Sequence, residues 1–559
     1  MKGNDFQKKS KPMKQENAMS IRYPENPHFN PLVLRVGDYK EYKESWAHDP
    51  SLFEDDDGTF YCFSTDAFRA PNGYQIRKST DLIHWEYVGS AFDLANSKEA
   101  YARGEAYDKF SCLQPAYNWS LTKKSESALQ ICTKEDGSMG FWAPYVTKGA
   151  DGRYWLYFAL TGYFGGSKSC IGVAKSDKVT GPYNFEELIV CSAANWRSPN
   201  AIDPQIVYDA AGEMYMVYGS YGLGLYLIAL DKNTGHRKDG YTRKDYDQGK
   251  CSFGEYFGKH LASGSIEGGV IKYHEGVDVL DRATGKWTKK NYYYLMCSFG
   301  SLSKVYNMRC GRSENIEGPY VDVNGNMLVC ATDVGSGNKQ MGSFIWEDTK
   351  IDFFCPGHND MQITSKGINV ISYHCRTHGV DLKPILSIPA PDGKKRTRVT
   401  ASMKKNFCPH FLFISQYTFN SDGWLVMNPN RYAGEELQPV TSEEFIDVSD
   451  GEFSMVLFKQ DAEQEKTTQA KRVYLTNDGK ITGAYRGTWK MYGKNYIEIC
   501  VEHEVYRGVV MPAWAEAQNH ACLCATLMGE RFGMAMYLNS YYRAEDLLDG
   551  QSLNAKIQG

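Results

Sequence analysis

The stretch HDPSLFED (His48–Asp55) recurs in altered form four more times, as WAPYVTKG (Trp142–Gly149), IDPQIVYD (Ile202–Asp209), IEGGVIKY (Ile266–Tyr273) and HNDMQITS (His358–Ser365). Each copy begins with polar or small residues and continues as a short apolar strand. In three copies a Gly-containing turn and an aromatic-rich strand follow at a fixed offset. A unit of this kind that recurs five times is typical of a β-propeller with five blades.

Aligned on the repeat, five residues are equivalent, namely Asp49, Ala143, Asp203, Glu267 and Asn359. Three of them are carboxylates, and equivalent positions of a propeller converge on its axis. Pro50 and Pro204 follow two of these carboxylates and mark strand starts, because proline cannot donate to a sheet ladder. Each carboxylate alone could be a turn or capping residue. Three in register indicate glycoside cleavage, which uses convergent carboxyl groups.

The chain has 559 residues, which is too long for one compact core, so two domains are expected. Residues 1–40 are predicted to be a polar arm, residues 41–383 the propeller, and the Pro-rich residues 384–400 a linker. Residues 401–559 are strand-rich without the repeat, which predicts a smaller antiparallel β-barrel or sandwich. The expected fold class is all-β. Insertions at 96–140, 232–263 and 275–290 interrupt the repeats.

Composition excludes some classes of partner. The net charge is −4 with both signs spread along the chain, so no basic stripe predicts nucleic-acid binding. No apolar run approaches transmembrane length, so no membrane span is expected. The first twenty residues are polar and show no signal peptide, which leaves an intracellular location open. The oligomeric state cannot be read from the sequence.

The repeats also resemble a known family. The motifs WAHDPSLFED, FWAPYV, NAIDPQIVYD, SGSIEGGVIKY and PGHND are similar to the inner-strand motifs of glycoside hydrolase family 43, in particular the endo-1,5-α-L-arabinanases. DGWLVMNPNRYAGE (Asp422–Glu435) and ITGAYRGTW (Ile481–Trp489) resemble the C-terminal domain of the larger arabinanases. The resemblance implies a five-bladed propeller that cleaves internal bonds of arabinan with inversion, outside the cytoplasm. One departure is Ile-Glu-Gly-Gly where related sequences often have Glu-(Gly/Ala)-Pro.

By this resemblance, Asp49 is the general base and Glu267 the general acid, and Asp203 raises the pKa of the acid and orients it. Base and acid of an inverting enzyme lie about 6.5–9.5 Å apart, which leaves room for the attacking water. His358 is expected to help hold one calcium ion on the axis, largely through waters, although calcium prefers oxygen ligands.

Five residues are expected to contact substrate: His48, Trp142, Asn200, Ser220 and Phe299. Trp142 resembles a platform on which a sugar ring stacks. Two alternatives remain open. The first is an exo-acting arabinofuranosidase or xylosidase of the same fold. The second is a non-catalytic carbohydrate-binding propeller, against which the three axial carboxylates argue.

Overall fold

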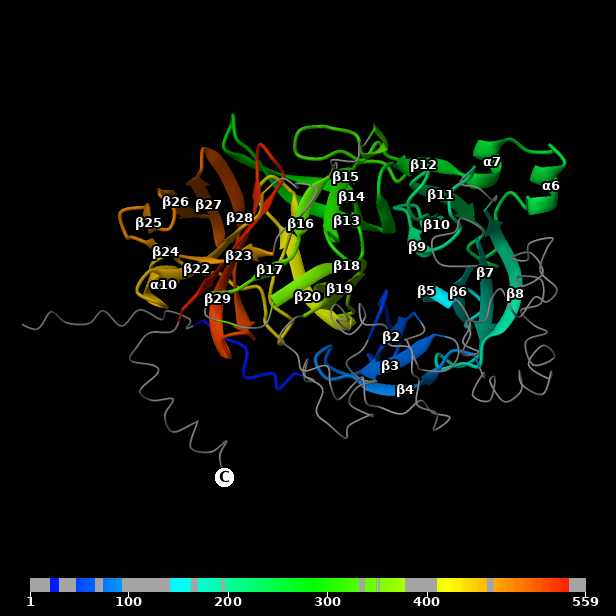
Figure 1. Cartoon of the computed structure of the whole chain (residues 1–559), viewed down its shortest axis with the longest axis horizontal. Helices are drawn as coiled ribbons and strands as arrows, with labels where there is room; N and C mark the ends of the chain where they lie inside the picture. The colour runs from blue at the N-terminus through cyan, green and yellow to red at the C-terminus, as the bar shows by residue number, and fades with distance from the viewer. Residues whose placement is uncertain are drawn as a thin grey trace, which may run out of the picture.

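The computed structural model describes residues 21–29, 47–65, 74–92, 141–161, 169–192, 197–330, 337–347, 349, 352–377, 410–459 and 467–541. Within them the chain forms four four-stranded sheets, one six-stranded sheet and one closed barrel. The five sheets are the blades of a propeller, as the repeats predict. The barrel stands beside blades 4 and 5 (Figure 1).

The first four blades are antiparallel meanders of four strands each. Blade 1 contains β1 (Ser51–Glu54), β2 (Phe60–Ser64), β3 (Gln75–Ser79) and β4 (Glu86–Ser90). Blade 2 contains β5 (Phe141–Lys148), β6 (Tyr154–Thr161), β7 (Ser169–Ser176) and β8 (Asn184–Cys191). Blade 3 contains β9 (Gln205–Tyr208), β10 (Met214–Tyr218), β11 (Leu225–Leu230) and β12 (Lys259–Ala262). Blade 4 contains β13 (Ile266–Asp281), β14 (Lys286–Phe299), β15 (Asn307–Ser313) and β16 (Asn338–Met341).

The fifth blade extends beyond the predicted domain boundary. It contains β18 (Asp352–Ile363), β19 (Asn369–Arg376), β20 (His410–Phe419) and β21 (Leu425–Met427), with β17 (Phe344–Ile345) on the far side of β18. Two of these strands, β20 and β21, fall in the predicted C-terminal domain of residues 401–559. The structure corrects the propeller end from residue 383 to β21, because β20 and β21 continue the sheet of β17, β18 and β19. The predicted linker, 384–400, lies outside the described residues.

The C-terminal domain is a closed barrel, one of the two architectures predicted. Its strands are β22 (Glu452–Leu457), β24 (Lys471–Leu475), β25 (Lys480–Gly483), β26 (Gly487–Tyr492), β27 (Tyr496–Val501), β28 (Glu504–Ala515), β29 (His520–Gly529) and β30 (Ala535–Ser540). Burial alternates along the strands. In β24, Val473 and Leu475 are buried while Tyr474 is exposed, which places the apolar residues inside the barrel. Helix α10 (Ser442–Asp447) precedes β22.

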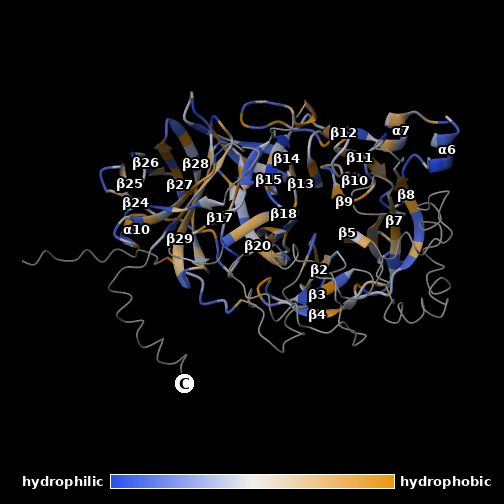
Figure 2. Cartoon of the chain, in the orientation of Figure 1, coloured by the Kyte–Doolittle hydropathy of each residue, from blue (hydrophilic) through white to orange (hydrophobic). Residues whose placement is uncertain are grey.

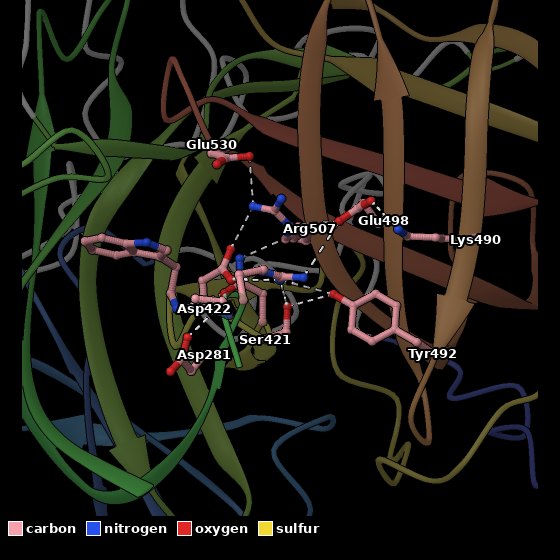
Figure 3. A network of polar contacts seen from close by, with 12 residues as sticks. Asp281, Ser421, Asp422, Lys490, Tyr492, Glu498, Arg507 and Glu530 are labelled. Atoms are coloured by element: carbon pink, nitrogen blue, oxygen red, sulfur yellow. Dashed lines mark hydrogen bonds and ion pairs between the residues drawn. The ribbon is translucent and has the colours of Figure 1, made fainter. Parts of the chain in front are cut away.

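Propeller and barrel form one body. Strand β23 (Thr468–Gln469), from the C-terminal half, pairs in parallel with β17 of blade 5. A polar network also crosses the junction (Figure 3). Arg507 of β28 forms ion pairs with Glu498 (2.9 Å), Glu530 (2.9 Å) and Asp422 (3.2 Å). Arg282, at the tip of the β13–β14 hairpin, pairs with Asp422 at 2.7 Å.

One insertion forms two short helices, and another lengthens a hairpin. Residues 232–263 contribute α6 (Arg243–Asp247) and α7 (Phe253–Phe257); η2 (Leu328–Cys330) lies in blade 4. Helix α6 has no buried residue and is hydrophilic in Figure 2. Residues 275–290 form the outer part of the β13–β14 hairpin. The insertion at 96–140 lies outside the described residues. In the part of the chain that the structure describes, no helix has the length and apolar character that a membrane crossing requires.

Of the predicted N-terminal arm, residues 21–29 are described. Arg22 pairs with Glu436 at 2.6 Å, and Phe29 lies under the guanidinium of Arg431. This part of the arm therefore packs on the segment between blade 5 and the barrel.

Candidate active site

Every blade begins with the same irregularity. In blade 4, Glu267 pairs with Ser298 and Val270 pairs with Met296, so three steps along β13 oppose two along β14. Blades 2 and 5 have the same bulge, at Trp142–Tyr145 and Gly357–Asp360. Blades 1 and 3 show the same spacing in their hydrogen bonds. In blade 1 the amide of Thr65 donates to the carbonyl of His48, and in blade 3 the amide of Gly219 donates to the carbonyl of Ile202. A β-bulge turns side chains away from the regular pleat.

The second residue of each bulge has a left-handed backbone. Its φ is 53° at Asp49, 41° at Ala143, 60° at Asp203, 58° at Gly268 and 49° at His358. Such a conformation is uncommon for residues other than glycine and is concentrated at functional sites. These five residues, one from each blade, are the true structural equivalents.

The predicted alignment is therefore right in three blades and wrong by one residue in blades 4 and 5. Gly268 and His358 take the places assigned to Glu267 and Asn359. The bulge is common to all five blades, but in blades 4 and 5 the polar residue that resembles Asp49 in the sequence does not stand at its left-handed position. In blade 4 the left-handed position is filled by glycine, and the carboxylate sits one residue earlier.

An axial cavity lies within the ring of bulges. Three consecutive residues from each blade line it, starting with the left-handed one: Asp49–Ser51, Ala143–Tyr145, Asp203–Gln205, Gly268–Val270 and His358–Asp360. Its volume of about 20 Å³ is enough for one water molecule or one small ion. The ring thus brings Asp49, Asp203 and His358 together, as predicted, with Glu267 beside it.

Asp49 is buried, with 6% of its surface exposed, and donors surround its carboxylate. His48 Nδ1 lies 2.7 Å from Oδ2, and the Thr65 hydroxyl donates to the same oxygen at 2.5 Å. His358 Nδ1 lies 3.0 Å from Oδ1. Burial raises the pKa of Asp49, but His358, His48 and the hydrogen bonds outweigh burial and hold this pKa well below its usual range. The carboxylate stays ionised and can accept a proton.

The pKa of Asp203, the carboxyl group beside Glu267, is shifted in the opposite direction. Burial, followed by the negative charges of Glu267 and Asp49, raises the pKa of Asp203 well above its usual range. The two oxygens of Glu267 accept hydrogen bonds from Tyr306 (2.7 Å) and Ser220 (2.8 Å). The raised pKa keeps a proton on Asp203, beside Glu267. An ionised carboxylate and a neighbouring carboxyl group that holds a proton suit general base and general acid chemistry.

Three imidazoles lie next to Asp49, and their geometry does not suit a metal. His48, His374 and His410 have ring nitrogens within 4.8 Å of one another. The Asp49 amide donates to Nδ1 of His374 (3.1 Å), and Arg376 donates to Nε2 of His410 (2.8 Å). The other nitrogen of each of these two rings then carries the proton and cannot bind a metal. Burial lowers the pKa of both, that of His374 to about 3, so both rings are neutral and pack against the base.

His358 and the next two residues fit a hard cation better. Because the Asp49 carboxylate can only accept, Nδ1 of His358 donates to it, and Nε2 is the nitrogen that a metal ion would take. The side-chain oxygen of Asn359 and one oxygen of Asp360 are buried at the same cavity without a hydrogen-bond partner among the described residues. Burial raises the pKa of Asp360 to about 6, although Lys272 opposes this. Oxygen atoms short of partners are ligands that calcium prefers.

The five residues predicted to contact substrate separate into three groups. His48 and Trp142 take the first place in their bulges and are partly exposed. Ser220 and Asn200 are buried, and Ser220 contacts the predicted acid. Phe299 is buried in the apolar cluster shared by blades 3 and 4, so it packs as a core residue and its substrate contact stays a prediction.

Several residues of the site were not predicted from the sequence. Thr65 and His374 come from the ends of second strands, and Tyr306 precedes a third strand. All three lie outside the repeated motif. A signal existed for Thr65 and His374, since each lies opposite the first bulge residue of its blade. No comparable pattern marks Tyr306.

Comparisons with known proteins agree with this geometry. The family model Glycosyl hydrolases family 43 matches residues 116–425, and a C-terminal lipocalin-like domain matches residues 429–537. An extracellular endo-α-(1→5)-L-arabinanase of Thermotoga petrophila is 31% identical over 507 residues, which cover 84% of this chain and 88% of that protein. Extracellular endo-α-(1→5)-L-arabinanase 2 of Bacillus subtilis is 28% identical over 505 residues, with coverage of 85% and 88%.

A solved structure is also similar. The crystal structure of endo-1,5-α-L-arabinanase from Thermotoga petrophila RKU-1 has a TM-score of 0.67 at 27% identity, covering 89% of this chain and 99% of that one. The first family model spans more than half of this chain. The five blades, their axial carboxylates and these matches lead to one conclusion: the chain belongs to glycosyl hydrolases family 43 and is a glycoside hydrolase.

Proposed function

We propose that the protein is an endo-acting arabinanase that hydrolyses internal α-1,5-L-arabinofuranosidic bonds with inversion at the anomeric carbon. The observation that carries this proposal is that the pKa values of two axial carboxyl groups are shifted in opposite directions. The pKa of Asp49 is held well below its usual range, while that of Asp203, beside Glu267, is raised well above it. Two relatives that align with more than four fifths of the chain are named endo-arabinanases, which directs the proposal to arabinan.

In the proposed reaction Asp49 is the base and Glu267 the acid. A water oxygen bonds to the anomeric carbon while one water proton passes to Asp49. The bond from that carbon to the leaving oxygen breaks, and the leaving oxygen takes the proton of Glu267. Asp203 lies beside the acid, and such proximity of two carboxyl groups favours the protonated form of one of them. Glu267 lies one residue outside the ring that holds Asp49, and this offset favours the wide separation of about 6.5–9.5 Å that inversion needs.

The substrate is proposed to lie over the mouth of the ring. Trp142 occupies the same bulge position in blade 2 as Glu267 in blade 4, and its ring is partly exposed, so we propose that it faces the same mouth of the ring. An aromatic face suits the apolar face of a sugar. His48 holds Asp49 by its Nδ1 and leaves Nε2 for a substrate hydroxyl. Asn200 is a weaker candidate because it is buried.

We also propose one calcium ion in the axial cavity, held by His358 with the oxygens of Asn359 and Asp360. When bound, the ion would supply a fixed positive charge near the carboxyl groups. Elemental analysis of protein stripped with chelator and reloaded should give one calcium per chain, and Asp360→Asn should lower this number. Calcium that neither binds stoichiometrically nor raises the unfolding temperature would contradict the proposal.

Product analysis tests the proposed activity. Early digestion of linear arabinan should release a range of oligosaccharides, and proton NMR should detect the β-anomer first. Asp49→Asn and Glu267→Gln should each lower turnover by about a hundred- to ten-thousand-fold while folding is retained. Arabinose alone would indicate an exo-acting arabinofuranosidase, and activity confined to an aryl xyloside would indicate a xylosidase. No product from either substrate would indicate a binding propeller, and first-formed α-anomer a retaining mechanism.

The location is proposed to be extracytoplasmic, because both relatives are named extracellular proteins. Fractionation of cells that express the protein from its natural gene tests this. Recovery in the cytoplasmic fraction alone would contradict it.

A further inference from the structure

We propose that Tyr306 is a positioning residue for the acid Glu267 and that its hydroxyl decides which carboxyl oxygen carries the proton that is transferred. The inference rests on the proposed function, because it assigns a role within the same reaction. No repeat motif pointed to Tyr306.

The two oxygens of Glu267 are bonded from two different blades. The Tyr306 hydroxyl, just before β15 of blade 4, donates to Oε1 at 2.7 Å. The Ser220 hydroxyl, just after β10 of blade 3, lies 2.8 Å from Oε2. Both residues are buried, Tyr306 with 0% and Ser220 with 3% of its surface exposed. The carboxyl group is therefore held in one orientation before substrate arrives.

The fold reserves space for the Tyr306 ring. A Cβ atom on Gly357 would lie 2.2 Å from Cε1 of Tyr306, so only glycine fits beneath the ring. On another side the ring stacks on His374 with centroids 5.8 Å apart and an interplanar angle of 14°. His374 in turn accepts the amide N–H of Asp49. The ring therefore fills the space between the supports of the acid and of the base.

The two hydroxyls differ as donors. A phenol is more acidic than an aliphatic alcohol and donates more strongly. Burial and the charge of Glu267 raise the pKa of Tyr306 well above its usual range, so the phenol keeps its proton. With Oε1 accepting this bond, the proton of the neutral acid belongs on Oε2. The Ser220 hydroxyl can rotate to accept from it or to donate.

The bond to Tyr306 should strengthen during the reaction. As the acid gives up its proton, negative charge develops on the carboxyl group, and hydrogen bonds to charged oxygens are stronger than those to neutral ones. An interaction that is stronger in the transition state than before it accelerates the chemical step. Asp203 and Tyr221 are the other titratable groups whose charges act on Glu267.

The decisive variant is Tyr306→Phe. Its matched control is Tyr218→Phe, which removes an equally buried hydroxyl that donates to the backbone carbonyl of Phe257 at 2.8 Å. Each enzyme is assayed on two arabino-oligosaccharide glycosides, one with methanol and one with 4-nitrophenol as leaving group. Nitrophenolate departs without much help from an acid, so a defect that acts through Glu267 should nearly vanish on that substrate.

For Tyr306→Phe we expect kcat/KM to fall about ten- to a hundredfold on the methyl glycoside and about threefold or less on the nitrophenyl glycoside. The alkaline limb of the pH–rate profile should move to higher pH by about one unit, because loss of a donor to the ionised acid keeps it protonated longer. Tyr218→Phe should change both substrates equally and leave the limb in place. Gly357→Ala keeps the hydroxyl but displaces the ring, and should reproduce the dependence on leaving group.

Two results would overturn the role assigned to Tyr306 and leave the proposed function intact. One is an active wild type whose Tyr306→Phe variant is slowed equally on both substrates. The other is a variant with wild-type rates and an unmoved alkaline limb. A wild type that cleaves no arabinan substrate would instead overturn the proposed function, and the assignment with it.

Discussion

Glu435 lies at the junction of the two domains, and replacing it with glutamine should remove a pH dependence of stability. The carboxyl group is buried, with 1% of its surface exposed, between blade 5 and the barrel. It accepts hydrogen bonds from the amide of Ala433 (2.7 Å) and the side chain of Asn428 (3.3 Å). Burial raises the pKa of Glu435 to about 7, although these hydrogen bonds oppose the rise.

The sign and size of the pH dependence of the free energy of unfolding follow from this pKa shift. The folded-state pKa is above the ordinary value of 4.5, so the stability contribution of the group is complete below about pH 4.5 and is lost as pH rises through about 7. At 1.36 kcal/mol per pKa unit the loss totals about 3.4 kcal/mol, of which about 2.5 kcal/mol falls between pH 5 and pH 8. Glutamine does not titrate, so its steric and hydrogen-bonding costs are the same at both pH values.

Equilibrium unfolding in urea at pH 5 and pH 8 gives the test. The free energy of unfolding of Glu435→Gln minus that of wild type should rise by about 2.5 kcal/mol between the two pH values. Glu436→Gln is the matched control, because this neighbour is exposed and pairs with Arg22 on the surface. Its difference from wild type should stay constant. If the Glu435→Gln difference also stayed constant within about 0.5 kcal/mol, the reasoning from burial would be refuted.

Three further predictions concern the site and the junction. Asp203→Asn removes the like charge beside Glu267, so the alkaline limb of kcat/KM should move to lower pH by about one unit or more, and an unmoved limb would show that the two carboxyls do not interact. Thr65→Val removes the hydroxyl bonded to Asp49, so kcat/KM should fall about tenfold and the acid limb should move to higher pH; a wild-type acid limb would contradict the role of Thr65. Arg507→Met removes a cation that three carboxylates share, although Asp422 keeps Arg282 and Glu498 keeps Lys490. Urea unfolding at low salt should therefore show a loss of about 1–3 kcal/mol that shrinks in high salt, and equal losses at both salt concentrations would argue against ion pairing.

The propeller could be predicted because each blade starts with the same short polar head, apolar strand and turn. The barrel could be predicted as one of two architectures, because the alternation of buried and exposed residues in strands such as β24 is visible in the local sequence. The outer hairpin of the fifth blade could not be predicted, because the sequence does not say which sheet a hairpin joins. The hairpin of β20 and β21 follows a Pro-rich stretch that reads as a domain boundary, yet β20 pairs with β19.

The site was predicted in part for a related reason. Asp49 and Asp203 stand out because proline follows each of them and marks the strand start. Glu267 was identified by its place in the repeat and its role by the family resemblance, but its register was wrong by one residue because its place in the bulge leaves no trace in hydrophobic alternation. Tyr306 and His374 reach the carboxyls from later strands, and only the closed ring of blades brings them there.

The repeated bulge explains how five similar blades produce an asymmetric site. The backbone presents one residue per blade to the axis, and the chain varies only the side chain at that place. Two of the five places are filled by Ala143 and Gly268, which have no functional group. Glycine has a direct use there, since a Cβ on Gly268 would lie 3.3 Å from the ring of His358, which bonds to Asp49. An empty place in blade 4 therefore lets the histidine of blade 5 support the base of blade 1, while the carboxylate of blade 4, one residue earlier, is free to act as the acid.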